Sequence, residues 1–332
     1  MESLYPGYQY RSNRCMVHGV RDALSNSSPA QLVQMRRHRA LPTRVLKFRA
    51  PALRHGQCRR QMSTELEGVA ALETVKVELD GHVATLTINR PKALNALNAA
   101  VVGDLHAALD ALGRLTGDST LRCLIVTGAG EKSFVAGADI AGMVGMSVEE
   151  AASYSAATHA AFEKIERLPV PVLAAVNGFA LGGGCELAMS CDIIYASDRA
   201  KFGQPEVKLG LMPGFAGTVR LPRRVGIGAA SEWIYSGNMY TAEDALSIGL
   251  VQRVLPADEL ATHVRGIANT IASMAPLAVR ASKDVMTNGM RMSPDEAALS
   301  EVKVFSELFV TDDAKEGCAA FVEKRGATWK GS

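Results

Sequence analysis

Ala-Ala-Val-Asn-Gly-Phe-Ala-Leu-Gly-Gly-Gly-Cys-Glu-Leu-Ala, residues Ala174–Ala188, is the stretch around which the rest of this chain is organised. The apolar run Val170–Val176 ends in Asn177-Gly178, and three consecutive glycines and a lone carboxylate, Glu186, follow it. Consecutive glycines let a backbone approach a ligand closely, and a helix that starts there offers unpaired N–H groups to an anion. The pattern therefore indicates either an oxyanion hole beside a catalytic acid or a tight strand-to-helix turn in which the glycines serve packing.

The composition of the 332-residue chain is that of an α/β globular protein with a sizeable core, since 48% of its residues are hydrophobic. Six scattered cysteines contain no C-x-x-C pair and the seven histidines are dispersed, so the sequence predicts reduced thiols and no metal site. No apolar run reaches the roughly 18–20 residues that a membrane helix needs. We therefore expect a soluble protein without a membrane partner.

Residues 1–61 are a different kind of sequence from the rest of the chain. They hold eleven Arg and one Lys against two acidic residues, a charge of about +10, whereas the other 271 residues carry about −8. Three explanations remain open: an over-long start with translation from Met62, a mitochondrial transit peptide, or a basic arm that binds nucleic acid or anionic lipid. We expect a disordered extension, with the protein in the cytoplasm, or in the mitochondrial matrix if the extension is a transit peptide.

Strands and helices alternate from Val75 to about residue 200. Apolar patterns predict strands over Val75–Leu79, Val83–Ile88, Cys123–Val126, Val170–Val176 and Asp192–Ala196. Helices are expected over Leu94–Leu115, Ser147–Leu168 and Gly184–Ser190, and almost everywhere after Gly228, with N-caps at Thr241, Ser293 and Thr311. The sequence thus predicts an α/β core over residues 62–257 and a helical C-terminal region over residues 258–332.

Four features could carry chemistry: Gly137-Ala138-Asp139, Gly182–Glu186, Glu206 and the C-terminal stretch Phe321–Arg325. Two small-residue turns after strands can each offer one backbone N–H to the same oxygen. Two glutamates in apolar surroundings can share one water molecule, one as base and one as acid, if burial raises the pKa of one of them. Taken singly, each has a plainer interpretation, such as a helix N-cap for Asp139 or a solvated helix face at the C-terminal stretch.

Together these features resemble the enoyl-CoA hydratase/isomerase family of the crotonase superfamily, and within it the short-chain enoyl-CoA hydratases. The ordered blocks that carry the resemblance are Ile88–Leu97, Ala136–Ile140, Asn177–Glu186, Phe202–Glu206, Thr311–Asp313 and Phe321–Arg325. The resemblance implies a spiral of ββα units with a helical C-terminal trimerisation region. It also implies a homo-oligomer, either a trimer or a dimer of trimers.

The same resemblance implies a reversible syn addition of water to a trans-2-enoyl-CoA, a step of fatty-acid β-oxidation, with no cofactor because coenzyme A is part of the substrate. The backbone N–H groups of Ala138 and Gly183 would form the oxyanion hole. Glu186 and Glu206 would hold the water, with Glu206 protonating the α-carbon and Glu186 orienting and deprotonating the water. The implied contacts to substrate and coenzyme A are Lys92, Ala93, Leu94, Ala136, Asp139, Ile140, Phe305, Phe321 and Lys324, the last ones reaching the nucleotide end from this or a neighbouring subunit.

One departure from the family pattern is Ala141, where some relatives carry a lysine that could contact the coenzyme phosphates. Two other functions remain open beside hydration. The fold also serves Δ3-Δ2 enoyl-CoA isomerases and other acyl-CoA lyases, although possession of both glutamates favours a hydratase. Some relatives bind AU-rich RNA, and the basic extension raises that alternative, although we expect no nucleic-acid partner.

Overall fold

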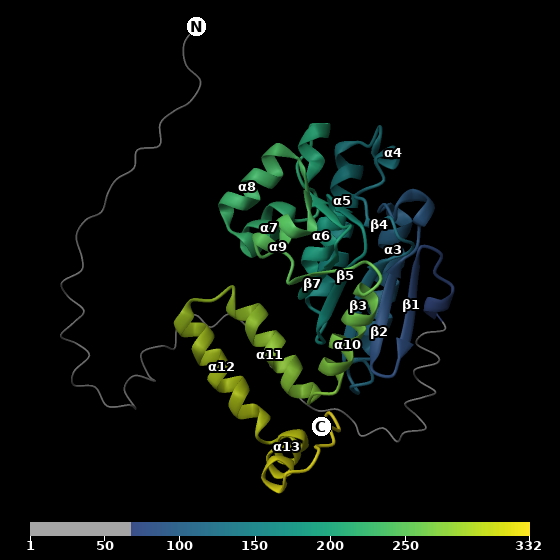
Figure 1. Ribbon diagram of the computed structural model, residues 1–332. Coiled ribbons are helices and arrows are strands. Elements are labelled where there is room, and N and C mark those ends of the chain that lie inside the picture. Colours follow the sequence, from purple (N-terminus) through teal and green to yellow (C-terminus); the bar gives the residue numbers. More distant parts are fainter. Residues whose placement is uncertain (1–67) are drawn as a thin grey trace, which may run out of the picture. The chain divides into compact units, whose positions relative to one another are not determined.

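Two β-sheets organise residues 68–332, the part of the chain that the computed structural model describes (Figure 1). The larger sheet has the strand order β1-β2-β3-β5-β7-β10. Its strands are β1 (Val75–Asp80), β2 (Val83–Ile88), β3 (Cys123–Gly128), β5 (Val172–Val176), β7 (Ile193–Ser197) and β10 (Arg253–Leu255). All neighbours pair in parallel except β1 and β2, which form the antiparallel hairpin that the sequence predicted around Asp80-Gly81.

Alternation along the central strands divides the core between the two faces of this sheet. Leu124 and Val126 of β3 face the main core, whereas Cys123 and Ile125 face a second cluster. The main core includes apolar residues of α3 (Ala99–Arg114) and α5 (Val148–Glu166), and the second cluster includes those of α10 (Leu260–Ala272). Because apolar residues cover both faces of the sheet at β3, the sequence of this strand is an almost continuous apolar run, as expected for a buried parallel sheet.

The smaller sheet brings together the ends of three very short strands. Its order is β4 (Ser133–Val135), β6 (Phe179–Leu181), β8 (Lys201–Gly203) and β9 (Met239–Thr241), and the first three run parallel. The carboxyl ends of parallel strands lie at the same edge of a sheet. Residues 136–139, 182–186 and 204–206, which follow these strands, are therefore collected at one edge.

The remaining helices connect and cover the sheets. They are η1 (Pro91–Ala93), α4 (Ile140–Met143), α6 (Gly183–Ser190), η2 (Pro205–Leu209), α7 (Gly217–Val225), α8 (Ile227–Ser236), α9 (Ala242–Ser247), α11 (Pro276–Gly289), α12 (Pro294–Leu308) and α13 (Asp312–Glu323). The predicted N-caps Thr241, Ser293 and Thr311 are confirmed, since each side chain accepts a hydrogen bond from the third helical N–H.

The short strands of the smaller sheet were not predicted, and two further details of the predicted secondary structure differ from the structure. The helix expected from Leu94 begins only at Ala99, because Leu94 and Asn95 have positive φ angles that a right-handed helix excludes. The region after Gly228 is not wholly helical, since β9 and β10 lie within it. Both of these strands have only three residues, too few to show a period of two.

The C-terminal helices α12 and α13 lie well apart from α4 and α6 in Figure 1. Lys283 attaches the preceding helix, α11, to the core: its Nζ lies 2.7 Å from Asp192 Oδ2 and donates to Val170 O at 2.9 Å. No residue of α12 is buried; Phe305 on this helix and Phe309 at its C-cap are about 60% exposed (61% and 59%). An apolar helix face of this kind marks a surface that another chain can cover.

Within residues 68–332, no helix has the length and apolar character needed to cross a bilayer. The predictions made for residues 1–61 fall outside the described part of the chain.

Candidate active site

The first turn of the site follows β4 and is held against the segment that precedes α3. Leu97 N donates to Gly137 O at 2.8 Å and Asp139 N donates to Leu97 O at 2.6 Å, so Leu97 and Ala138 form a parallel bridge. In such a bridge the N–H of the middle residue, Ala138, points away from its partner strand. No group among residues 68–332 accepts a hydrogen bond from this N–H, which leaves it open to a ligand oxygen.

A buried asparagine and an arginine hold this first turn in place. Asn95 is left-handed (φ 59°) and its Nδ2 donates to the carbonyl oxygens of Ala129 and Ser133, at 3.0 and 2.8 Å. Arg90 Nη2 lies 3.1 Å from Asp139 Oδ2. Asp139 does stand at the N-cap position of α4, but its side chain makes no capping bond. Its carboxylate therefore serves the ion pair and not the helix cap.

The second turn, between β6 and α6, lies directly against the first. A Cβ added to Gly184 would be 1.8 Å from Val135 O, and one added to Gly137 would be 3.2 Å from Leu181 O. A Cβ at Gly184 has no room, and Gly137 has a positive φ (111°) that strains any other residue, so these two positions require glycine. Gly183 is the first residue of α6, and in the described part of the chain its N–H has no acceptor. The site thus places a second open donor on the turn that adjoins the first.

Gly182 and Gly183 lie where a side chain would be strained or would crowd its neighbours. Gly182 has φ +49°, and a Cβ there would be 2.7 Å from Glu206 Oε1. A Cβ on Gly183 would be 3.0 Å from the Phe215 ring and 3.1 Å from Leu97 Cδ1. The sequence left a choice between a packing turn and an anion site, and the geometry combines the two: the glycines pack backbone on backbone and keep space beside an open N–H.

Glu186, in the first turn of α6, is fully buried. Its Oε1 accepts hydrogen bonds from Phe215 N at 2.8 Å and from Gly217 N at 2.6 Å. Its Oε2 is also buried, and it has no hydrogen-bond partner within residues 68–332. One carboxyl oxygen is therefore held by the protein, and the other is available to a water molecule or a substrate.

The turn that holds Glu186 was not singled out by sequence reasoning. Ala216 is left-handed (φ 74°), so the N–H groups on either side of it point the same way and form an anion-binding nest. Arg220 Nη1 donates to Phe215 O at 2.6 Å, and Glu166 Oε1 lies 2.7 Å from Arg220 Nε. The available signal was the pair of glycines, Gly214 and Gly217, that flank the aromatic residue.

Glu206 stands at the start of η2, facing Gly182, and is only partly buried. The neighbouring Gln204 is fully buried. With its amide oriented to satisfy its surroundings, the Gln204 nitrogen donates to Glu206 Oε1 at 2.9 Å and to Oε2 at 3.1 Å. The loop after β8 therefore brings the second predicted glutamate to the same edge of the sheet as Glu186.

Burial raises the pKa of both carboxyl groups to about 7. For Glu186, desolvation is the largest cause, repulsion from Glu206 adds to it, and the N–H groups of Gly217 and Phe215 oppose it. For Glu206, desolvation raises the pKa. Near neutral pH such a pair holds one proton more readily than none or two, which is the state in which one group acts as acid and the other as base.

The raised pKa of Glu186 has a consequence for stability. Its folded pKa of about 7 lies above the ordinary 4.5. Below pH 4.5 this carboxyl therefore does not destabilise the folded state, and the free energy of unfolding decreases as the pH rises from 4.5 through 7. Glu186→Gln should therefore raise Tm at pH 8, by about 2–4 °C for each kcal/mol relieved, and should change it much less at pH 4.5. Thermal unfolding at both pH values checks this. The exposed Glu78→Gln is the control and should show no comparable difference between the two; an equal effect of both variants would contradict the expectation.

The predicted coenzyme contacts fall into two groups. Ala136 N donates to Leu94 O at 3.1 Å, which brings Lys92, Ala93 and Leu94 alongside the first turn and Ile140. Lys92, Leu94 and Ile140 are exposed there. Phe305, Phe321 and Lys324 are also exposed, but they lie on or at the end of α12 and α13, which the described chain does not bring to the site (Figure 1).

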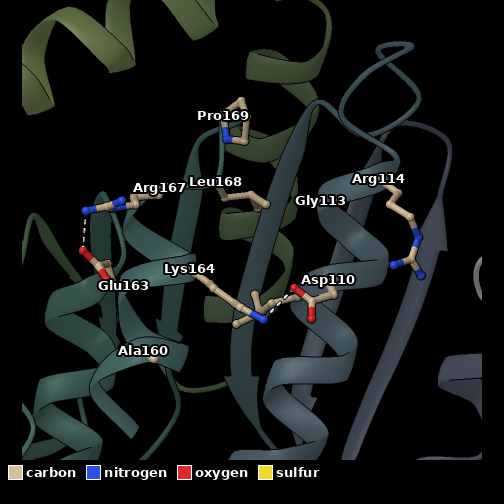
Figure 2. A pocket seen from close by; sticks show the side chains of 10 residues that line it. Asp110, Gly113, Arg114, Ala160, Glu163, Lys164, Arg167, Leu168 and Pro169 are labelled. Atoms are coloured by element: carbon tan, nitrogen blue, oxygen red, sulfur yellow. Dashed lines mark hydrogen bonds and ion pairs between the residues drawn. The ribbon is translucent and has the colours of Figure 1, made fainter. Parts of the chain in front are cut away.

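A surface hollow of about 520 Å³ lies elsewhere, between α3 and α5. Figure 2 shows two ion pairs among its charged side chains: Lys164 Nζ lies 2.6 Å from Asp110 Oδ1, and Arg167 Nη2 lies 2.5 Å from Glu163 Oε1. The residues that line it include neither of the two glutamates and no residue of either turn. The candidate active site is therefore the edge of the smaller sheet and not this hollow.

Comparisons with known proteins agree with this geometry. Residues 78–332 match the model of the family described as enoyl-CoA hydratase/isomerase. The chain is 49% identical over 254 residues to a short-chain-enoyl-CoA hydratase of Clostridium acetobutylicum, covering 76% of this chain and 96% of that protein. It is 48% identical over 259 residues to a crotonyl-CoA hydratase of Syntrophomonas wolfei, covering 78% and 98%.

Among solved structures, the chain is similar to an enoyl-CoA hydratase from Bacillus anthracis. The TM-score is 0.76 at 37% identity, and the match covers 78% of this chain and 100% of the other. The predicted α/β class with helical C-terminal elements is confirmed by the structure and by this likeness.

Proposed function

Because the chain belongs to the enoyl-CoA hydratase/isomerase family, we propose that it is an enoyl-CoA hydratase, which adds water reversibly and syn to a trans-2-enoyl-CoA and gives a 3-hydroxyacyl-CoA. The observation that carries the proposal is one sheet edge with two open backbone N–H groups and two carboxyls whose pKa values lie near 7. The fold is the crotonase fold that the resemblance implied. Adding water requires no redox or group-carrying cofactor, so we propose none.

The two backbone donors would bind the thioester oxygen. When water adds at C3, electron density moves onto that oxygen and an enolate-like transition state forms. N–H groups of Ala138 and Gly183 that already point at this oxygen stabilise the transition state more than the ground state, which is the requirement for catalysis. Removing one such donor typically costs on the order of 3–4 kcal/mol of barrier.

The two glutamates would move the protons. The free Oε2 of Glu186 is suited to orient the attacking water and take one of its protons, while the remaining hydroxide adds to C3. Glu206, held by Gln204, would give the proton that C2 acquires. The step then leaves Glu186 protonated and Glu206 ionised, and a proton exchange restores the starting state. Since the pair titrates as a unit, this division follows the resemblance and the geometry together.

The exposed face of α12 supports a further part of the proposal, assembly into a homotrimer or a dimer of trimers. Phe305, Phe309 and Phe321 would be covered in the assembly. Phe321 and Lys324 of one copy could then reach the nucleotide end of coenzyme A bound to another, while Lys92–Leu94, Ala136, Asp139 and Ile140 contact it within the chain. The relatives' names support a short acyl chain as the preferred substrate.

A direct assay tests the proposed reaction. With crotonyl-CoA, the protein should remove the absorbance of the enoyl thioester. The rate should fall by about tenfold or more when the acyl chain is lengthened to ten carbons, since each methylene that does not fit a pocket costs about 1–3 kcal/mol. The competing isomerase is tested with a 3-enoyl-CoA, which an isomerase would convert to the 2-enoyl product faster than the protein hydrates crotonyl-CoA. That order of rates would overturn the hydratase assignment.

A further inference from the structure

Arg220, on α7, is a charged side chain that is almost completely buried (9% exposed) and that the proposed reaction does not use. We propose that Arg220, held by Glu166, is a positioning residue: it fixes the turn Phe215–Gly217 and through it the carboxylate of Glu186. The inference rests on the proposed function, because it assigns Glu186 to the reaction. It adds two residues, neither of which would touch the substrate.

Arg220 binds the turn at a point between the two N–H groups that donate to Glu186. Arg220 Nη1 donates to Phe215 O at 2.6 Å. That oxygen belongs to the peptide unit that joins Phe215 to Ala216, which lies between the N–H of Phe215 and the N–H of Gly217. Holding this peptide plane fixes the rotations on both sides of it, and so the directions of both N–H groups that bind Glu186 Oε1.

The turn needs this hydrogen bond because its backbone is strained. Ala216 has φ 74°, a left-handed conformation that costs a non-glycine residue free energy and persists only when its surroundings impose it. The Phe215 ring packs edge-on against Tyr154 and Phe162, with ring centroids 5.4 and 6.1 Å apart. These apolar contacts hold the ring, whereas the oxygen of the Phe215–Ala216 peptide is held by Arg220 Nη1.

Arg220 is itself held on two sides. Glu166 Oε1, on α5, lies 2.7 Å from its Nε, and its guanidinium carbon lies 5.9 Å from the centroid of the Phe162 ring. A charge-assisted bond to a fork-shaped guanidinium is directional, so the pair transmits the position of α5 to the turn. Glu166 is 27% exposed and can be replaced without opening the core.

Charge reinforces the geometric argument. The charged groups that face Glu186 are Glu206 from η2 and Arg220 from α7, and the neighbouring thiol of Cys185 stays neutral because burial raises its pKa. Arg220 lowers the pKa of Glu186, against desolvation and against Glu206. Loss of the arginine should therefore raise that pKa and move the acidic limb of the rate profile to higher pH, since Glu186 must be ionised to accept a proton.

Two variants with matched controls test the inference. Arg220→Met keeps the aliphatic bulk and removes the donors, and Glu166→Gln removes the charge that holds the arginine. Arg223→Met on α7 and Glu163→Gln on α5 make the same chemical changes at exposed positions outside the network. With crotonyl-CoA, Arg220→Met should lower kcat about 100-fold and KM less than about threefold, with the acidic limb shifted upward. Glu166→Gln should lower kcat by about 5–10-fold, and the controls should stay within about twofold of the parent.

The outcomes separate a positioning role from a structural one. Partial recovery of kcat in Arg220→Lys, with the acidic limb returning toward that of the parent, supports the inference. So does a double variant Glu166→Gln, Arg220→Met that is no slower than Arg220→Met alone, because the two residues then act on one path. A loss of kcat with an unmoved pH profile, or equal losses in Arg220→Met and Arg223→Met, would overturn it. If Arg220→Met does not fold, Glu166→Gln and its control decide the question by the same criteria.

A measurement without turnover distinguishes this inference from the proposed function. Carboxyl carbons of ¹³C-labelled glutamate can be titrated by NMR in the parent and in Glu166→Gln, with Glu186→Gln used to assign the resonance. A raised pKa of Glu186 in the variant supports the positioning role even if the parent proves inactive on every enoyl-CoA tested. An unchanged titration in an active enzyme would refute the positioning role and leave the proposed reaction standing.

Discussion

Glu186→Gln and Glu206→Gln should each lower kcat for crotonyl-CoA hydration by about 10³–10⁴-fold and leave KM within a few-fold of the parent. Each amide keeps the size of the carboxyl but can neither accept nor release the proton, and a positioned acid or base contributes about 10²–10⁴-fold. For Glu186 the effect should be chemical and not structural, because an amide oxygen can still accept the bonds from Phe215 N and Gly217 N.

The two substitutions should not add. Once either glutamate is replaced, the other can add little to the rate, because the acid and the base act as a unit. The double variant should therefore be only slightly slower than the slower single variant. Initial rates with purified, folded proteins measure this, and the exposed Glu149→Gln serves as the control. Retention of more than a tenth of the parental kcat by either single variant would remove that glutamate from the mechanism.

The parent enzyme should also show a bell-shaped pH dependence of kcat/KM. Because the pKa of each glutamate is raised to about 7, activity should decline on both sides of neutrality as the pair gains a second proton or loses its only one.

Gly184→Ala is the second change with a large expected effect. Its Cβ would lie 1.8 Å from Val135 O and 2.9 Å from Val135 Cβ, and the backbone of β4 cannot yield without losing its pairing with β6. The free energy of unfolding should fall by about 3 kcal/mol, the upper range for an overpacked core. The two turns should also separate, which moves the Gly183 N–H away from the position proposed for the thioester oxygen and should lower kcat about 10²–10³-fold.

Chemical denaturation and steady-state kinetics measure the two effects of Gly184→Ala together. Gly142→Ala is the matched control, because a Cβ at Gly142, in α4, meets nothing within 4 Å. That variant should keep the parental stability and kcat. If Gly184→Ala behaves like Gly142→Ala, the close contact between the turns is not what holds the oxyanion site together.

Much of the larger sheet could be predicted from the sequence, since β1, β2 and β3 are six-residue strands bounded by turn residues. In β1 apolar and charged residues alternate, whereas most of β3 is a continuous apolar run. The smaller sheet was missed for the opposite reason. Its strands β4, β6 and β8 have three residues each, a length at which neither alternation nor propensity rises above the background.

The sequence by itself indicated which residues could do chemistry here, namely two glycine-bearing turns after strands and two glutamates. They can be recognised because a run of glycines, and a carboxylate with apolar or Gly/Pro neighbours along the chain, are local properties of the sequence. Tertiary structure alone decided how they meet. The pairing of β4, β6 and β8 collects them at one edge, and the nest at Phe215–Gly217, with Arg220 and Glu166 behind it, leaves one oxygen of Glu186 free. These contacts join residues about 30 to 50 positions apart, whose proximity follows from strand pairing and packing and from no local pattern.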